Sequence, residues 1–207
     1  MIKIGIELNG VVRNINKQIL KYYQKDIDPS IDLDEIDDKD DVFKYVKFNS
    51  KAEKNEFIYI DYPYEIYAAA KPMEKNLPSE INGWIMDMTN REDEEFTVVY
   101  YSLDEEALTI QSSYFFLSKI GTRIRKVIFP KDFDEIKNEF DVIVTSNKDL
   151  VENNLKGNSQ IYTILINNLV NEGCKDIVNK NYNSLSEMIK DESILNELKE
   201  FVVDRKK

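Results

Sequence analysis

Short runs of β-branched and aromatic residues alternate with segments of helical spacing, and this alternation is the feature that most limits the fold. The strand-like runs are residues 2–8, 96–102, 126–129, 140–146 and 161–166. Each run is almost continuously apolar, which is typical of strands that are covered on both faces. The pattern therefore predicts an α/β fold: a Rossmann-like parallel sheet with helices on both faces.

Residues that commonly cap helices mark where the helices should begin and end. Asn14 precedes apolar residues at helical spacing, Ser79 precedes another such series, and Ser102 follows a strand-like run. Each is a candidate N-cap, because its side-chain oxygen can accept a hydrogen bond from a free backbone amide. Gly121 is placed to end the helix that follows Ser102, and residues 184–202 are expected to form one or two amphipathic helices.

Length and charge restrict the class of protein. A chain of 207 residues suits one large domain, and its formal net charge of -11 argues against binding to nucleic acid. No apolar run approaches the roughly 20 residues that cross a bilayer, so no membrane partner is expected. Cys174 is the single cysteine and the first residues do not resemble a secretion signal, which predicts synthesis in a reducing cytoplasm.

The chain contains no histidine, and this absence narrows the chemistry open to it. A Ser/His/Asp triad and a Cys/His zinc site are excluded, which leaves carboxylates, lysine, tyrosine and serine as reactive groups. The acidic run from Asp32 to Asp41 lacks the spacing and the central glycine of a calcium-binding loop. We interpret that run as a solvated surface.

The first strand-like run is followed by Gly-Val-Val-Arg-Asn at residues 10–14. This segment resembles the first motif of the haloacid dehalogenase-like (HAD-like) superfamily, an apolar strand followed by Asp-x-Asp-Gly-Val. In that family the first Asp attacks phosphorus beside Mg²⁺ and the second moves the leaving-group proton. Glu7 and Asn9 occupy these positions here. Glu7 is longer than Asp by about 1.5 Å, and an amide such as that of Asn9 cannot donate and recover a proton at neutral pH.

The same resemblance assigns three further positions. Ser102 corresponds to the residue that holds the transferred phosphoryl group, and Gly10 would join it in a phosphate-binding site. Ser146 stands where the family places an Asp that holds Mg²⁺, and a neutral hydroxyl is a poor ligand for that ion. The family's phosphate-binding lysine would fall at Lys126 or Lys137. Both lysines also have an ordinary explanation as surface charges.

The resemblance covers residues 2–25 and 96–168. It implies a HAD-like core made of residues 1–25 and 96–207. Residues 26–95 would form a small, mainly helical cap inserted after the first strand and helix.

Two functional hypotheses of different classes follow. In the first, the chain is a non-catalytic HAD-like protein that serves as a structural or assembly subunit, because Glu7, Asn9 and Ser146 all depart from the catalytic pattern. Its many Tyr and Phe residues suit contacts with protein partners in a homo- or hetero-oligomer, with no cofactor or metal. A composition typical of AT-rich genomes suggests a bacteriophage connector or tail protein, made in the host cytoplasm and then built into the virion.

The second hypothesis is an enzyme, a divergent Mg²⁺-dependent phosphatase or nucleotidase. Glu7 would be the nucleophile or a metal ligand, and Ser102 would hold the phosphate, with Asn9 at the position of the acid/base group. Lys126 would stabilise negative charge, and Asp141 or an acid from another loop would complete the metal shell. A third interpretation keeps phosphate binding near Ser102 without cleavage.

Overall fold

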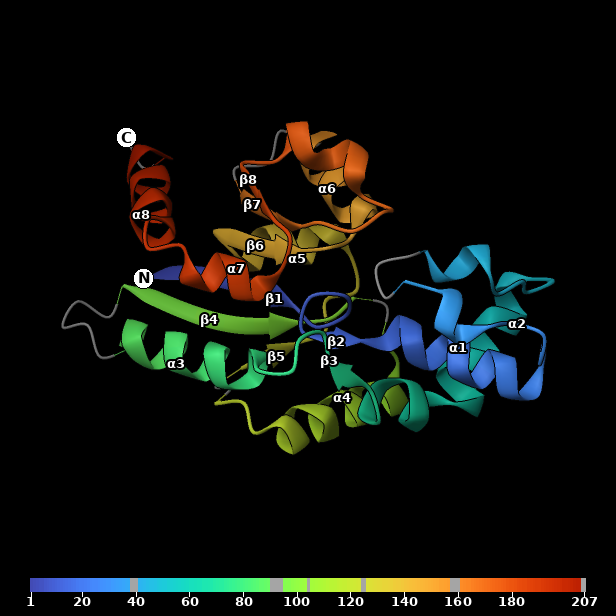
Figure 1. Cartoon of the computed structure of the whole chain (residues 1–207). Helices are drawn as coiled ribbons and strands as arrows, with labels where there is room; N and C mark the ends of the chain where they lie inside the picture. The colour runs from blue at the N-terminus through green and yellow to red at the C-terminus, as the bar shows by residue number, and fades with distance from the viewer. Residues whose placement is uncertain (38–40, 90–94, 104, 124–125, 157–160, 206–207) are drawn as a thin grey trace.

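A parallel sheet forms the centre of the molecule, in a computed structural model that describes residues 1–37, 41–89, 95–103, 105–123, 126–156 and 161–205. Residues 38–40 of the acidic run lie outside the described part. The sheet has the order β5-β4-β1-β6-β7-β8, and every neighbouring pair runs parallel (Figure 1). Its strands are β1 (Ile2–Glu7), β4 (Phe96–Tyr101), β5 (Val127–Ile128), β6 (Val142–Thr145), β7 (Tyr162–Ile166) and β8 (Lys180–Tyr182).

Side chains alternate between the two faces of this sheet and build a core on each. Ile4 of β1 and Val144 of β6 face the larger apolar cluster, together with α3 (Leu77–Thr89), α7 (Leu185–Lys190) and α8 (Ile194–Arg205). Ile143 faces the opposite cluster, where Ile136 of α5 (Phe133–Glu139) and Leu150 of α6 (Lys148–Lys156) pack. Helices on both faces confirm the predicted α/β, Rossmann-like fold.

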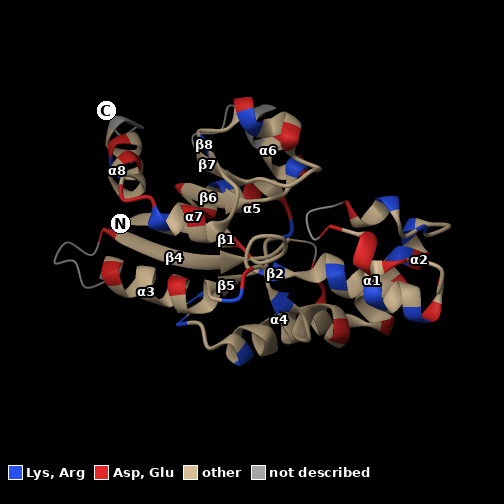
Figure 2. Ribbon diagram, in the orientation of Figure 1, with Lys and Arg blue, Asp and Glu red and all other residues tan. Residues whose placement is uncertain are grey.

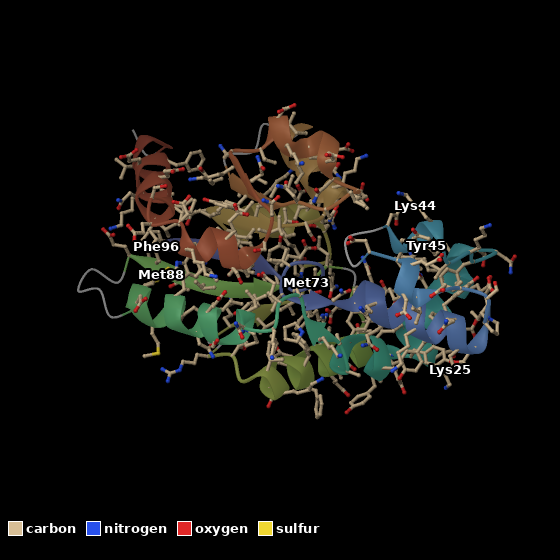
Figure 3. All side chains as sticks on the ribbon, viewed as in Figure 1. Lys25, Lys44, Tyr45, Met73, Met88 and Phe96 are labelled. Carbon is tan, nitrogen blue, oxygen red and sulfur yellow. The ribbon has the colours of Figure 1, made fainter. Side chains whose placement is uncertain are left out.

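Met88 near the end of α3 and Phe96 at the start of β4 both belong to the larger cluster (Figure 3). Both side chains are almost fully buried. Their packing holds α3 against the amino-terminal end of the sheet, away from the polar residues described below.

A third apolar cluster forms a small helical unit, which we define as residues 15–70 and which lies on the right of Figure 1. Ile19, Tyr23, Phe57 and Tyr67 are among its buried residues. Its helices are α1 (Ile15–Asp26), η1 (Leu33–Glu35), η2 (Val42–Lys44), α2 (Lys51–Asn55) and the π-helical turns η3 (Glu56–Asp61) and η4 (Tyr64–Ala68).

The chain enters the helical unit through β2 (Arg13–Asn14) and leaves it through β3 (Lys71–Pro72), and these two short strands pair antiparallel. Met73, directly after β3, donates its backbone amide to the carbonyl of Val12 (2.9 Å) and packs against the larger cluster (Figure 3). By apolar packing α1 belongs to the helical unit, whereas α3 belongs to the sheet. The division into a core and an insertion at residues 26 and 95 stays a prediction.

Two predicted helix ends are confirmed and two are wrong. Asn14 caps α1 by accepting the amide of Lys17 (3.0 Å), and Gly121 ends α4 (Ala107–Ile120) with a φ of 68°. Ser79 lies inside α3, where its hydroxyl donates to the carbonyl of Asn76 (2.8 Å). Ser102 does not cap α4, because that helix begins only after Glu106.

Two elements of the sheet's second half were not predicted, namely α6 and β8. The last described irregular helix is η5 (Glu172–Ile177). Among the described helices, none is both long enough and apolar enough to cross a membrane.

Candidate functional site

The strand order creates a crevice between β1 and β6. From β1 the chain runs outward to β4 and β5, and then crosses back to place β6 on the other side of β1. The chain therefore continues from β1 toward one edge of the sheet and from β6 toward the other edge. Open α/β sheets bind ligands at the carboxyl ends of two strands related in this way. Glu7 ends β1 and Thr145 ends β6, so both lie at this position.

The Glu7 carboxylate is buried, with 4% of the residue exposed. Its Oε2 accepts a hydrogen bond from the Thr145 hydroxyl (2.6 Å) and another from the backbone amide of Ser146 (3.0 Å). The Thr145 hydroxyl in turn accepts from the amide of Asn147 (3.0 Å). The carboxylate therefore links the end of β1 to the end of β6.

Asn9 connects the next two residues of the site. Its Nδ2 donates to the Ser102 hydroxyl (3.0 Å), and its Oδ1 accepts from Nε of Arg13 (2.7 Å). Ser102 is completely buried. The Ser102 hydroxyl is thus already engaged by the Asn9 amide.

Arg13 is the largest fully buried side chain of the site. Its Nη2 lies 2.5 Å from Oε1 of Glu105, and its Nη1 donates to the Ser113 hydroxyl (2.7 Å). Ser113 donates to the other Glu105 oxygen (2.6 Å). Arg13, Glu105 and Ser113 thus form a closed triangle that joins β2, the segment after β4, and α4.

Aromatic rings enclose the guanidinium group. The Arg13 Cζ atom lies 4.7 Å from the ring centre of Tyr67 and 5.6 Å from that of Phe116. Burial raises the pKa of Glu105, and the attraction of Arg13 opposes that rise. Arginine keeps its proton in proteins, so we treat the two groups as an ion pair. Tyr67 belongs to η4, which ties the helical unit to the same network.

Gly10 allows the turn after β1 to pass close to β6. Its φ is 78°, and a β-carbon at this position would collide with the hydroxyl oxygen of Ser146. The Ser146 carbonyl accepts from the side-chain amides of Asn168 (3.2 Å) and Asn171 (2.9 Å). Gly10, Glu7, Asn9, Ser102 and Ser146, the positions assigned by the family resemblance, are therefore brought together.

Asp141 and Lys126 are not part of this group, and their predicted roles are wrong. The Asp141 carboxylate accepts from the backbone amide of Lys3 (2.9 Å), four residues before Glu7 and so about 13 Å away along the strand. The Lys126 ammonium lies 2.5 Å from Glu139, which also pairs with Lys3 (3.5 Å). Both charges point to the amino-terminal end of the sheet.

Lys137, the other candidate for the phosphate-binding lysine, forms an ion pair with Asp134 one helical turn away (3.5 Å). Both partners belong to α5. The lysine thus has the ordinary role of a surface charge.

The donors at the strand ends do not fit Mg²⁺. Hard divalent cations prefer several carboxylate oxygens, whereas Oε2 of Glu7 accepts from a hydroxyl and a backbone amide. Across the described ranges, no three His, Cys, Asp or Glu residues lie close enough together to hold a metal ion. Asp141 cannot supply the missing carboxylate for the reason given above.

Two cavities flank the network. A cleft of about 770 Å³ opens beside Glu105, between the helical unit and the segments after β4 and β5, with Lys51, Lys54 and Lys131 on its walls. A second cavity of about 480 Å³ adjoins Gly10 and is lined mainly by apolar side chains and asparagines.

Arg13 and Glu105 are the functional residues that sequence reasoning missed. Arg13 was noted within the Gly-Val-Val-Arg-Asn segment without a role. An arginine directly after two valines, Val11 and Val12, was the available signal, because a charge placed in an apolar segment calls for a buried partner. Nothing in the sequence near Glu105 identified that partner.

No family model and no curated protein matches this sequence. Among solved structures, the backbone is similar to the crystal structure of a dehalogenase, with a TM-score of 0.47 and 12% sequence identity. The similarity covers 91% of this chain and 95% of the dehalogenase. The fold described here rests on strand order and direction, and we transfer no residue role from that protein.

Proposed function

We propose that this chain is a HAD-like protein without catalytic activity that serves as a structural or assembly subunit. The proposal rests on one observation, that the polar groups of the site form hydrogen bonds with one another. Thr145 and Ser146 hold Glu7, while Arg13 and Ser102 hold Asn9. These groups support the fold in positions where an enzyme would expose reactive groups to a substrate.

Among the described residues, those at the positions of the catalytic motif do not suit the steps of phosphoryl transfer. A nucleophilic carboxylate must approach phosphorus, but that of Glu7 is buried and accepts two hydrogen bonds. Proton transfer to the leaving group needs an acid, and Asn9 is an amide. A nearby cation must stabilise the negative charge of the transferred phosphoryl group, yet Arg13 is already paired with Glu105.

Hydrolysis of a broad panel of phosphate esters in the presence of Mg²⁺ tests this proposal. We expect no turnover by the native protein. Turnover that disappears in Glu7→Ala but persists in Glu172→Ala, an exposed control, would refute the proposal and identify a divergent phosphatase. Activity gained only in the triple variant Glu7→Asp, Asn9→Asp, Ser146→Asp would support a catalytic scaffold retained without its chemistry.

The proposed cellular setting is a virion connector or tail, with protein partners. Composition is the support for this setting, and the contacts described above bear only on the loss of catalysis. Co-purification with assembled particles is the experiment that addresses it. A protein recovered only outside particles would contradict the virion role and leave the non-catalytic assignment intact.

A further inference from the structure

The outward side of α4 carries three large apolar residues, which is unusual for a surface helix. Leu108, Tyr114 and Phe115 are 50%, 52% and 49% exposed. The outward side of a surface helix normally carries charged and polar residues. In Figure 2, α4 is drawn mostly in the colour of uncharged residues. Among the exposed positions of α4 only Lys119 is charged, and its ammonium donates to the carbonyls of Ala68 and Ala70 (3.3 Å each).

Tyr64 of the helical unit contacts this face, and Ile60 precedes Tyr64 in the sequence. Tyr64 of η4 is 51% exposed, and its ring centre lies 5.5 Å from that of Phe115. Ile60, four residues before Tyr64, is 64% exposed. We name the set Ile60, Tyr64, Leu108, Tyr114 and Phe115 the α4 face.

The size of the α4 face agrees with that of a protein interface. Large apolar side chains offer about 200 Å² each, so these half-exposed residues present on the order of 500 Å². A stable interface buries about 800 Å² on each partner, and about 65% of a homodimer interface is apolar. The apolar part of the α4 face therefore matches the amount that a dimer of this chain would need.

Charge indicates which partner fits. The chain carries a formal net charge of -11, so two copies repel each other wherever their charged surfaces meet. In a twofold dimer the same patch meets itself, and a charge close to the twofold axis would face its own like charge. The five side chains of the α4 face are uncharged. Self-contact through this face therefore brings no like charges of the face together, whereas a basic partner would gain no ion pair from it.

We propose that the α4 face is the interface of a symmetric dimer of this chain. The inference deepens the proposed function, on which it rests, by naming the contact through which a structural subunit first associates. Tyr64, Tyr114 and Phe115 supply the rigid aromatic area that is enriched at such interfaces.

Sedimentation velocity over a wide concentration range tests the proposal, at a salt concentration that screens the repulsion between acidic chains. We expect a species of twice the 24.3 kDa chain mass. Phe115→Glu should raise the dissociation constant roughly 100-fold, because it buries two unpaired carboxylates at the contact. Val203→Glu is the matched control, since Val203 on α8 is 55% exposed and lies outside the α4 face.

Tyr114→Lys serves as a second variant should Phe115→Glu fail to give the native circular dichroism spectrum. A native protein that is monomeric at every concentration overturns the inference, as does any association that neither variant weakens. Association that the α4 variants weaken and Val203→Glu leaves intact supports it.

The outcome is independent of the hydrolysis test. A monomer without turnover would refute this interface and leave the non-catalytic assignment standing. A dimer with turnover lost in Glu7→Ala would refute that assignment and leave the interface standing.

Discussion

Arg13 and Glu105 form an ion pair from which solvent is completely excluded, with Nη2 of one 2.5 Å from Oε1 of the other. Removing one partner of such a pair leaves a buried charge without compensation. We therefore expect Arg13→Met to lower the free energy of unfolding by about 3–5 kcal/mol. Urea denaturation measures the change.

The double variant Arg13→Met, Glu105→Leu is the control for this first prediction. Replacing both charges by apolar groups removes the unpaired carboxylate, so the double variant should be more stable than Arg13→Met alone. Equal stability of the two variants would show that packing around Arg13, including its contacts with Tyr67 and Phe116, matters more than charge.

Gly10→Ala should destabilise the protein, because its φ of 78° strains any other residue and the new β-carbon meets the Ser146 hydroxyl. Backbone strain of this kind costs about 1–3 kcal/mol. Gly83→Ala provides the opposite control, since Gly83 lies inside α3 with nothing within 4 Å of its would-be β-carbon. Alanine should stabilise that helix by about 0.5–1 kcal/mol. Thermal unfolding of both variants compares them directly, and a neutral Gly10→Ala would contradict the described turn.

Gly5 makes room for the ring of Phe140, since a β-carbon at Gly5 would lie 2.9 Å from ring atoms. We expect Gly5→Ala to cost about 1–3 kcal/mol of stability through overpacking. Phe140→Leu should relieve part of that cost. A double-mutant cycle by urea denaturation measures the coupling, and strict additivity of the two changes would exclude direct contact.

Asp191 should make stability depend on pH at the acid end. Lys180 lies 2.8 Å from its carboxylate and Tyr182 donates to it (2.6 Å), and these hydrogen bonds, Lys180 first, lower the pKa of Asp191. A lowered folded-state pKa contributes stability above the unfolded value of about 3.9, and that contribution is lost as pH falls through the folded pKa. Asp191→Asn should therefore be less stable than the native protein at neutral pH.

The difference between Asp191→Asn and the native protein should shrink as the solution is acidified below the usual range of an aspartate. Urea midpoints measured from neutral to acidic pH follow this change. Asp134→Asn is the control, because the Asp134 side chain is 85% exposed and pairs only loosely with Lys137. A difference for Asp191→Asn that is constant across pH would mean that the carboxylate's charge is not what stabilises the native state.

The strands of the sheet could be predicted because their sequences are nearly continuous apolar runs. The run at 161–166, for example, is buried along the whole of β7. By contrast, β8 contains Lys180 and Asn181 at the sheet edge, and a polar edge strand has no such pattern. Ser79 failed as a cap because Pro78 suits the first turn of α3, which begins at Leu77.

The site was predictable only in part, for a geometric reason. Glu7 and Ser102 end or follow strands, so a parallel sheet brings them to one edge. Asp141 precedes β6 and lies beside Lys3. The place of Asp141 in the sheet depends on which residue of the apolar run 140–146 begins β6. Boundaries of this kind are set by pairing with neighbouring strands, which the local sequence does not specify.

The pairing of β2 with β3 also affects how the helical unit can move away from the sheet. Arg13 lies in β2, so the residue at which the chain enters the helical unit is held by Asn9, Ser113 and Glu105. Swinging the unit about this crossing would pull a guanidinium out of its buried pair. Amide protons of α1 should therefore exchange with solvent through the same global opening that exposes β1, and the two elements belong to a single cooperative folding unit.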